Sequence, residues 1–106
     1  MTLENSKILS IIKNHLKDSS IESSDIRISK EDLNKAKSLY SMRYEWFKKK
    51  SKKDSSAYDS FINSLNNYKN HNNEVYLVRL KRKEKRESVY YINYETRQTI
   101  ELPFVY

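Results

Sequence analysis

The chain has 106 residues, of which 37% are hydrophobic, and its formal net charge is +7. This length predicts one domain over residues 1–106, with a helical part at 1–70 and a β part at 74–106. The absence of cysteine excludes disulfides and thiolate metal sites. No apolar run approaches the ~20 residues of a membrane span, and the N-terminus lacks a signal peptide pattern. We therefore expect a soluble cytoplasmic protein without a membrane partner.

The chain contains no glycine and one proline, whereas lysine, asparagine, isoleucine, serine and tyrosine are abundant. Codons rich in A and T explain this bias most simply, which favours a phage, mobile-element or low-GC bacterial source. The lack of glycine also excludes a phosphate-binding glycine-rich loop.

The first predicted element is a helix over residues 3–16. Ile8, Ile12 and Leu16 recur at helical spacing, and Leu9 and Ile11 widen the apolar stripe. A polar connector follows at 18–25. The segment DIRIS, at 25–29, alternates apolar and polar residues, so it is either a short strand or the lead-in to the next helix.

A second helix is expected to open at 29–32, with Ser29 as its N-cap and with Glu31 and Asp32 in its first turn. It runs to the basic segment KKKSKK at 48–53. Its apolar positions predict a helix that is buried on two sides. They are Leu33, Ala36, Leu39, Tyr40, Met42, Tyr44, Trp46 and Phe47.

A third helix is predicted from about Asp54, and its apolar spacing is the most regular in the chain. The positions of that stripe are Tyr58, Phe61, Ile62, Leu65 and Tyr68. The asparagine-rich segment 66–73 is expected to end it, because asparagine side chains compete for backbone hydrogen bonds.

The last third of the chain predicts three strands, at 75–83, 88–95 and 99–105, joined as an antiparallel meander. Tyr90, Ile92 and Tyr94 share one face, which we assign to the core, and Tyr91 then points to the opposite, outer face. The fold class is therefore α+β, with two to three N-terminal helices before a three-stranded antiparallel β-meander, in a winged-helix-like order.

The positive charge is concentrated in two short stretches. Residues 43–53 and 79–86 each carry six positive charges and one negative charge, whereas the remaining residues carry nine positive and twelve negative charges. Such clusters favour phosphate binding, although solvated turns would have the same composition. The candidate nucleic-acid-binding residues are Lys48, Lys49, Lys50, Lys52, Lys53, Arg79, Lys81, Arg82, Lys83, Lys85 and Arg86.

The leading hypothesis is a small basic nucleic-acid-binding protein, with duplex DNA preferred over RNA. It would hold phosphates through the hairpin at 79–87 and the basic run at 48–53. In a winged helix the third helix enters the major groove and the hairpin contacts the backbone. The polar positions of the third helix are Ser55, Ser56, Asp59, Ser60, Asn63, Asn66, Asn67 and Lys69.

The segments IRISKEDLNKAKSL and RESVYYINYETRQTIEL resemble the opening strand and helix and the closing strands of the RelE/ParE toxin superfamily. This resemblance implies a strand, two helices and an antiparallel sheet, and it implies cleavage of mRNA on the ribosome by basic and tyrosine side chains. The corresponding candidates are Arg79, Lys81, Arg86, Tyr91 and Tyr106.

A further alternative is an inhibitor, encoded by a phage or mobile element, that binds an acidic or nucleic-acid-binding host protein. Homodimerisation is also expected, because Trp46, Phe47 and the segment ELPFVY exceed what a small core hides. Neither His15 nor His71 has a partner at ligand spacing, and no carboxylate pair suggests acid–base catalysis. Apart from the toxin hypothesis, we expect neither an enzyme nor a metal or cofactor.

Overall fold

The computed structural model describes residues 2–50, 56–68 and 73–102, with Lys50 described in its main chain alone. The elements follow in the order α1 (Leu3–Leu16), a 3₁₀ turn η1 (Ser23–Asp25), β1 (Ile26–Asp32), α2 (Leu33–Lys50), α3 (Ser56–Asn66), β2 (Glu74–Leu80), β3 (Ser88–Ile92) and β4 (Thr99–Glu101). The predicted α+β class is confirmed, and the described part of the sheet has a fourth strand beyond the predicted meander.

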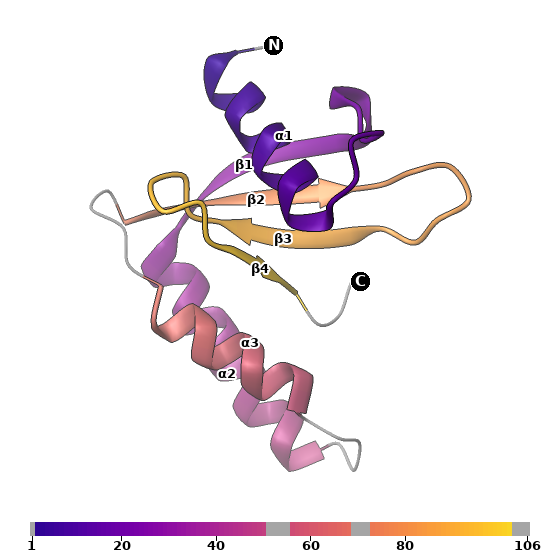
Figure 1. Ribbon diagram of the computed structural model, residues 1–106. Coiled ribbons are helices and arrows are strands. Elements are labelled where there is room, and N and C mark those ends of the chain that lie inside the picture. Colours follow the sequence, from indigo (N-terminus) through magenta and orange to yellow (C-terminus); the bar gives the residue numbers. More distant parts are fainter. Residues whose placement is uncertain (1, 51–55, 69–72, 103–106) are drawn as a thin grey trace.

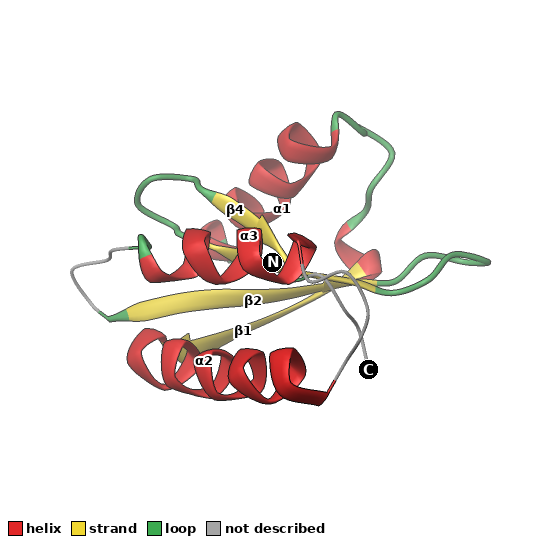
Figure 2. Ribbon diagram, turned by 90° about the horizontal axis from the view of Figure 1, so that it is seen from below, coloured by secondary structure: helices red, strands yellow, loops and turns green. Residues whose placement is uncertain are grey.

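The sheet lies between two helical layers (Figure 1). Its strands are antiparallel and follow the order β1-β2-β3-β4. Helix α1 covers one face, whereas α2 and α3 cover the other, with α2 contacting β1 and α3 contacting β4. Figure 2 shows α2 and α3 side by side over the strands. The helical pair therefore connects β1 to β2, which are neighbours in the sheet.

The segment at 25–29, for which the sequence left two interpretations, begins strand β1. This strand pairs with β2 along its whole length, from Ile26 opposite Leu80 to Asp32 opposite Glu74. Ile26 joins the core beneath α1, and Ile28 packs against that core. The short alternating pattern therefore belongs to a strand, and this strand extends as far as its pairing with β2.

Helix α2 begins at Leu33, so the predicted N-cap at Ser29 is wrong, because Ser29 lies within β1. Asp32 takes the capping role, since its Oδ1 accepts a hydrogen bond from the backbone N–H of Lys35 at 3.0 Å. That bond is the largest cause of the lowered pKa of Asp32. Asn73 joins the cap by donating to the same oxygen at 3.0 Å. The start of α2 is therefore tied to the start of β2.

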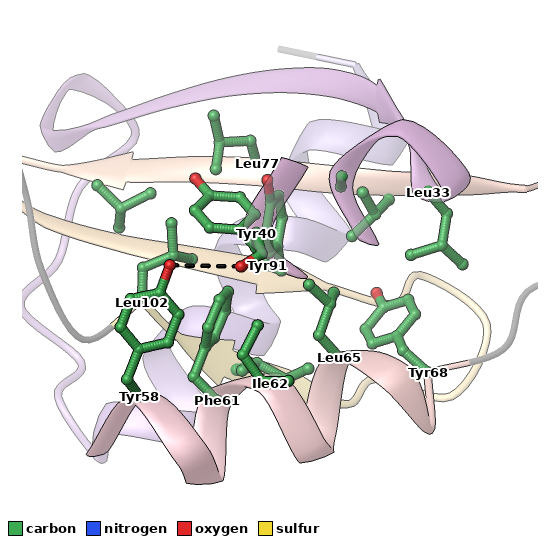
Figure 3. Packing of buried hydrophobic residues seen from close by; sticks show 14 residues of the cluster. Leu33, Tyr40, Tyr58, Phe61, Ile62, Leu65, Tyr68, Leu77, Tyr91 and Leu102 are labelled. Atoms are coloured by element: carbon green, nitrogen blue, oxygen red, sulfur yellow. Dashed lines mark hydrogen bonds between the residues drawn. The ribbon is translucent and has the colours of Figure 1, made fainter. Parts of the chain in front are cut away.

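Aromatic rings fill the core between the sheet and the pair α2–α3 (Figure 3). Tyr40 and Phe61 meet edge to face at 5.2 Å between ring centroids, and Phe61 stacks on Tyr91 at 6.4 Å. The hydroxyl of Tyr58 donates to the carbonyl of Tyr40 at 3.4 Å. All five apolar positions predicted for the third helix are buried, which confirms that pattern.

Tyr91 does not point to an outer face, as the sequence pattern predicted. It is 1% exposed and lies beneath α2 and α3, and its hydroxyl donates to Glu31 Oε2 at 2.9 Å. Tyr90 and Ile92 do face a core, which is the one under α1. The prediction for Tyr91 was wrong because helices cover both faces of the sheet, so alternation sends neighbouring residues into two different cores.

One side of α2 that the sequence predicted to be buried is exposed. Its inward positions Leu33, Ala36 and Tyr40 are buried, whereas Met42 is 65% exposed and Trp46 is 64% exposed. Leu39 lies with them on the outward side at helical spacing, and we call these three residues the α2 stripe. The stripe is exposed because the sheet meets α2 from one side and α3 meets it from another. Homodimerisation, predicted from Trp46, Phe47 and the segment ELPFVY, stays a prediction.

The described strands are shorter than the predicted ones. Strand β2 ends at Leu80 and β3 ends at Ile92, while residues 103–105 lie outside the described part of the chain. The β3–β4 turn is organised by the buried Asn93, whose Oδ1 accepts from the backbone N–H groups of Glu95 and Thr96 at 3.0 and 3.3 Å. Arg97 then takes a left-handed conformation, with φ of 65°, in place of a glycine.

Within the described ranges, no helix has the length and apolar character needed to cross a membrane.

Candidate nucleic-acid interface

The loop between β2 and β3, residues 81–87, projects beyond the body of the sheet (Figures 1 and 2). We call this loop the hairpin tip. Strands β2 and β3 pair from Tyr76 opposite Ile92 to Leu80 opposite Ser88, so the tip begins directly where a regular ladder ends. The ladder therefore presents the basic segment on a two-stranded ribbon.

Two of the predicted phosphate-binding residues already form ion pairs at the root of the tip. Arg79 Nη1, on β2, lies 2.9 Å from Oε1 of Glu87, the residue before β3. Arg82 Nη1 lies 2.8 Å from Oδ2 of Asp18, in the loop after α1. These pairs position the hairpin, and they reduce the charge that either guanidinium offers to a ligand.

The side chain of Lys81 also stabilises the conformation of the tip. Its ammonium donates to the carbonyl of Arg82 at 3.3 Å and makes a second, short bond to the carbonyl of Lys85. Glu84, between them, has φ of 63°, the left-handed conformation that glycine adopts most readily. A lysine that binds two carbonyls thus helps to close a tight turn that has no glycine.

Lys83, Lys85 and Arg86 are the cations that the tip presents outward. All three are exposed, and none has an ion-pair partner among the residues that the structure describes. The structure therefore divides the six predicted cations of this hairpin into three that build it and three that face solvent.

A hollow of about 280 Å³ lies at the root of the hairpin, between the end of α1 and strands β2 and β3. Leu16 and Leu80 contribute apolar lining. The polar lining comes from Asp18, Arg82, Lys85, Arg86, Ser88 and Tyr90. Three cations against one carboxylate give this hollow a net positive charge, and two hydroxyl groups add hydrogen-bonding capacity.

Arg82 is the most enclosed cation of the hollow, with a side chain that is 18% exposed. Its Nη2 reaches Ser20 Oγ at 3.5 Å, but its buried Nε has no hydrogen-bond partner among the described residues. Hydrogen bonds from Ser20 and from Arg82 hold the pKa of Asp18 well below its usual range. Asp18 therefore stays ionised, and the charge of the hollow is constant over ordinary pH.

Tyr90 also lines this hollow, although it is only 3% exposed. Burial raises the pKa of Tyr90 above its usual value, against an opposing hydrogen bond from Ser88. The phenol therefore keeps its proton and can donate it to an acceptor. His15 packs edge to face on the Tyr90 ring at 6.1 Å. Sequence reasoning assigned Tyr90 to the core and did not include it, or Ser88, in a site.

The second basic stretch lies at the end of α2, away from the hairpin tip (Figure 1). Lys48 pairs with Glu45 at 3.1 Å, and its ammonium lies 4.4 Å from the centroid of the Tyr44 ring. Lys49 is exposed. The side chain of Lys50, and all of Lys52 and Lys53, lie outside the described residues. The structure thus shows two separate basic regions on different elements.

The outward face of α3 agrees in part with the predicted polar positions. Ser56, Ser60, Asn63 and Asn66 are exposed. Asp59 instead turns toward α2, where it accepts a short hydrogen bond from the hydroxyl of Tyr44. This bond is the largest cause of the raised pKa of Tyr44. Ser55 and Lys69 lie outside the described residues.

The order of a strand, two helices and an antiparallel sheet, which the RelE/ParE resemblance implies, is present from Ile26 onward. Two of the residues that the resemblance suggests as catalytic already have partners within the fold. Tyr91 is buried on the face opposite Tyr90, and Arg79 is paired with Glu87. Tyr106 lies outside the described residues.

Within the described part of the chain, no group of three histidine or acidic side chains is arranged to hold a metal ion. No protein-family model, no curated protein and no solved structure matches this chain.

Proposed function

We propose that the protein binds nucleic acid, with duplex DNA as the first candidate, through the hairpin tip. The observation that carries this proposal is the projecting two-stranded ribbon that ends in the outward cations Lys83, Lys85 and Arg86. Neutralisation of backbone phosphates by such cations releases condensed counterions, which drives binding without any sequence preference.

The shape of the hairpin supports duplex DNA in particular. The major groove of B-DNA, about 12 Å wide, admits a two-stranded β-ribbon, and phosphates border it on both sides. The ion pairs of Arg79 and Arg82 fix the root of the ribbon, so less conformational freedom is lost on binding. The basic end of α2 offers a second contact, on a separate part of the molecule.

The test is the affinity for a labelled duplex over a salt series. In the double variant Lys83→Gln and Arg86→Gln, loss of two phosphate contacts should flatten the slope of log K against log salt by about 2. The matched control is Lys35→Gln with Arg97→Gln, which removes the same charge from exposed sites on α2 and the β3–β4 turn. Absence of duplex binding at low salt, or an equal change in both variants, contradicts the proposal.

A second candidate is an inhibitor that binds a host protein, and the α2 stripe favours it. Exposed apolar side chains that share one helix face mark protein contacts more often than nucleic-acid contacts. Capture of a protein from nuclease-treated host lysate should then be lost in a Met42→Ala and Trp46→Ala variant. It should be retained in the Lys83→Gln and Arg86→Gln variant, and the opposite result would reject the stripe as the contact.

A further inference from the structure

The hollow at the root of the hairpin has the chemistry of an anion site. The cations Arg82, Lys85 and Arg86 line it together with Ser88 and Tyr90, which each carry a hydroxyl group. Its volume of about 280 Å³ lies just under the ~300–1,000 Å³ of typical small-molecule pockets, so it suits a small group better than a large cofactor.

Arg82, which lines the hollow, has one buried N–H group without a hydrogen-bond acceptor among the described residues. A buried N–H without an acceptor is unfavourable, and the described residues leave Arg82 Nε in that state while Asp18 and Ser20 take its other nitrogens. A negatively charged oxygen placed in the hollow would accept from its lining cations and hydroxyls, and a turn of the Arg82 side chain toward it would give Nε an acceptor. Charge-assisted bonds of this kind are roughly twice as strong as neutral ones.

The charge of the hollow selects among anions. Its three cations and the ionised Asp18 leave a net charge of +2. A phosphate monoester carries about −2 at neutral pH, whereas a backbone phosphodiester carries about −1. From this match, we infer that the hollow binds a phosphate monoester, either the terminal phosphate of a nucleic-acid strand or the phosphate of a free nucleotide.

If the phosphate is the end of a nucleic-acid strand, the inference rests on the proposed function. The hairpin would then bind phosphorylated ends of nucleic-acid strands. Lys83 at the tip does not line the hollow, whereas Lys85 and Arg86 belong to both surfaces, so Lys83 is the tip cation that separates the two activities. Lys83 would then contact backbone phosphates, while Ser88 and Tyr90 would hold the end group.

The test follows backbone amide shifts by NMR at constant ionic strength, with adenosine monophosphate as the probe and adenosine as its unphosphorylated counterpart. We expect saturable shifts around Arg82 and Ser88 with the phosphorylated probe alone. Ser88→Ala and Tyr90→Phe keep the charge but each remove a donor to a charged acceptor, so each should weaken binding about tenfold. Ser88 is half-buried at a strand end, so its variant remains informative if Tyr90→Phe perturbs folding.

Lys83→Gln is the matched control for Lys85→Gln, since both remove one tip cation but Lys83 lies outside the hollow. If Lys83→Gln and Lys85→Gln weaken binding equally while Ser88→Ala has no effect, the probe is attracted by the overall charge of the tip and not by the hollow. That result would overturn the inference. An absence of saturable shifts would overturn it as well.

A 5′-phosphorylated oligonucleotide and its 5′-hydroxyl counterpart identify the source of the phosphate. Tighter binding of the phosphorylated strand supports strand-end recognition, whereas equal binding together with saturable shifts from the monophosphate supports a free nucleotide. If the hollow gives no signal while the tip variants still lower duplex affinity, the inference fails and the proposed function stands. If duplex binding is also absent, both fail.

Discussion

Arg82 and Asp18 lie 64 positions apart in the sequence, yet the guanidinium of the first is 2.8 Å from a carboxylate oxygen of the second. This ion pair ties the root of the β2–β3 hairpin to the loop that follows α1. Ser20 strengthens the arrangement, because its hydroxyl and its backbone N–H donate to Asp18 at 2.6 and 3.0 Å. The direction of the hairpin therefore depends on a helix from the opposite end of the chain.

The first prediction concerns the pH at which this tie, the ion pair between Asp18 and Arg82, is lost. Because the pKa of Asp18 is lower in the folded protein than in the unfolded chain, the tie contributes its full stability above the ordinary aspartate pKa of about 3.9. That contribution should decline as the pH falls from there through the lowered folded value. An NMR titration of the Asp18 carboxyl carbon should have its midpoint below the ordinary value. Ser20→Ala and Arg82→Gln should each raise it, and an ordinary midpoint in the unmodified protein would contradict the ion pair.

The second prediction concerns the hydroxyl of Tyr91. Tyr91→Phe removes its hydrogen bond to Glu31 without leaving a large cavity, so the free energy of unfolding should fall by about 1–2 kcal/mol. Urea denaturation measures this change. Tyr94→Phe is the control, because this half-buried ring lies on the other face and should lose less than about 0.5 kcal/mol.

The same Tyr91→Phe variant separates structure from ligand contact. Tyr91 is enclosed beneath α2 and α3, so the variant should bind duplex DNA with unchanged affinity. A loss of nucleic-acid binding or of any RNA cleavage, at unchanged secondary structure, would show that this hydroxyl contacts a ligand after all.

The third prediction compares two aromatic residues of the helical pair. Phe61→Ala opens a cavity beside Tyr40 and Tyr91 and should cost about 3–5 kcal/mol of unfolding free energy. Trp46→Ala removes a side chain that is 64% exposed, so the cost should stay within about 0.5 kcal/mol. Thermal and urea unfolding check both values. A large loss for Trp46→Ala would mean that a second molecule covers the α2 stripe, which analytical ultracentrifugation would reveal.

The fourth prediction uses the left-handed residue after α1. Lys17 has φ of 52°, and its N–H and that of Asp18 bond to the carbonyls of Asn14 and Lys13, which is the Schellman arrangement. In this left-handed conformation a residue with a Cβ costs about 1–2 kcal/mol. Glycine avoids that cost but loses more backbone entropy on folding, so the net gain is smaller. Lys17→Gly should therefore raise the free energy of unfolding by about 0.5–1 kcal/mol, whereas Lys17→Ala should give no gain. Equal values for the two variants would reject strain at this position.

Local patterns in the sequence determined the elements themselves. The spacing of Ile8, Ile12 and Leu16 predicted α1 with the bounds that the structure has, and the stripe from Tyr58 to Tyr68 predicted the buried face of α3. These predictions hold because helical periodicity depends on residues three or four positions apart. The concentration of positive charge in the hairpin is likewise a property of adjacent residues.

Tertiary structure decided which faces are covered and which charges remain outward. Alternation separates Tyr90 from Tyr91, but burial of both requires α1 on one side of the sheet and α2–α3 on the other. The α2 stripe is apolar yet exposed, because no described element packs against that side of the helix. The pairing of Arg82 with Asp18, and the hollow beside it, join segments that are distant in the chain. Contacts of this range follow from the packing of whole elements, which no local pattern encodes.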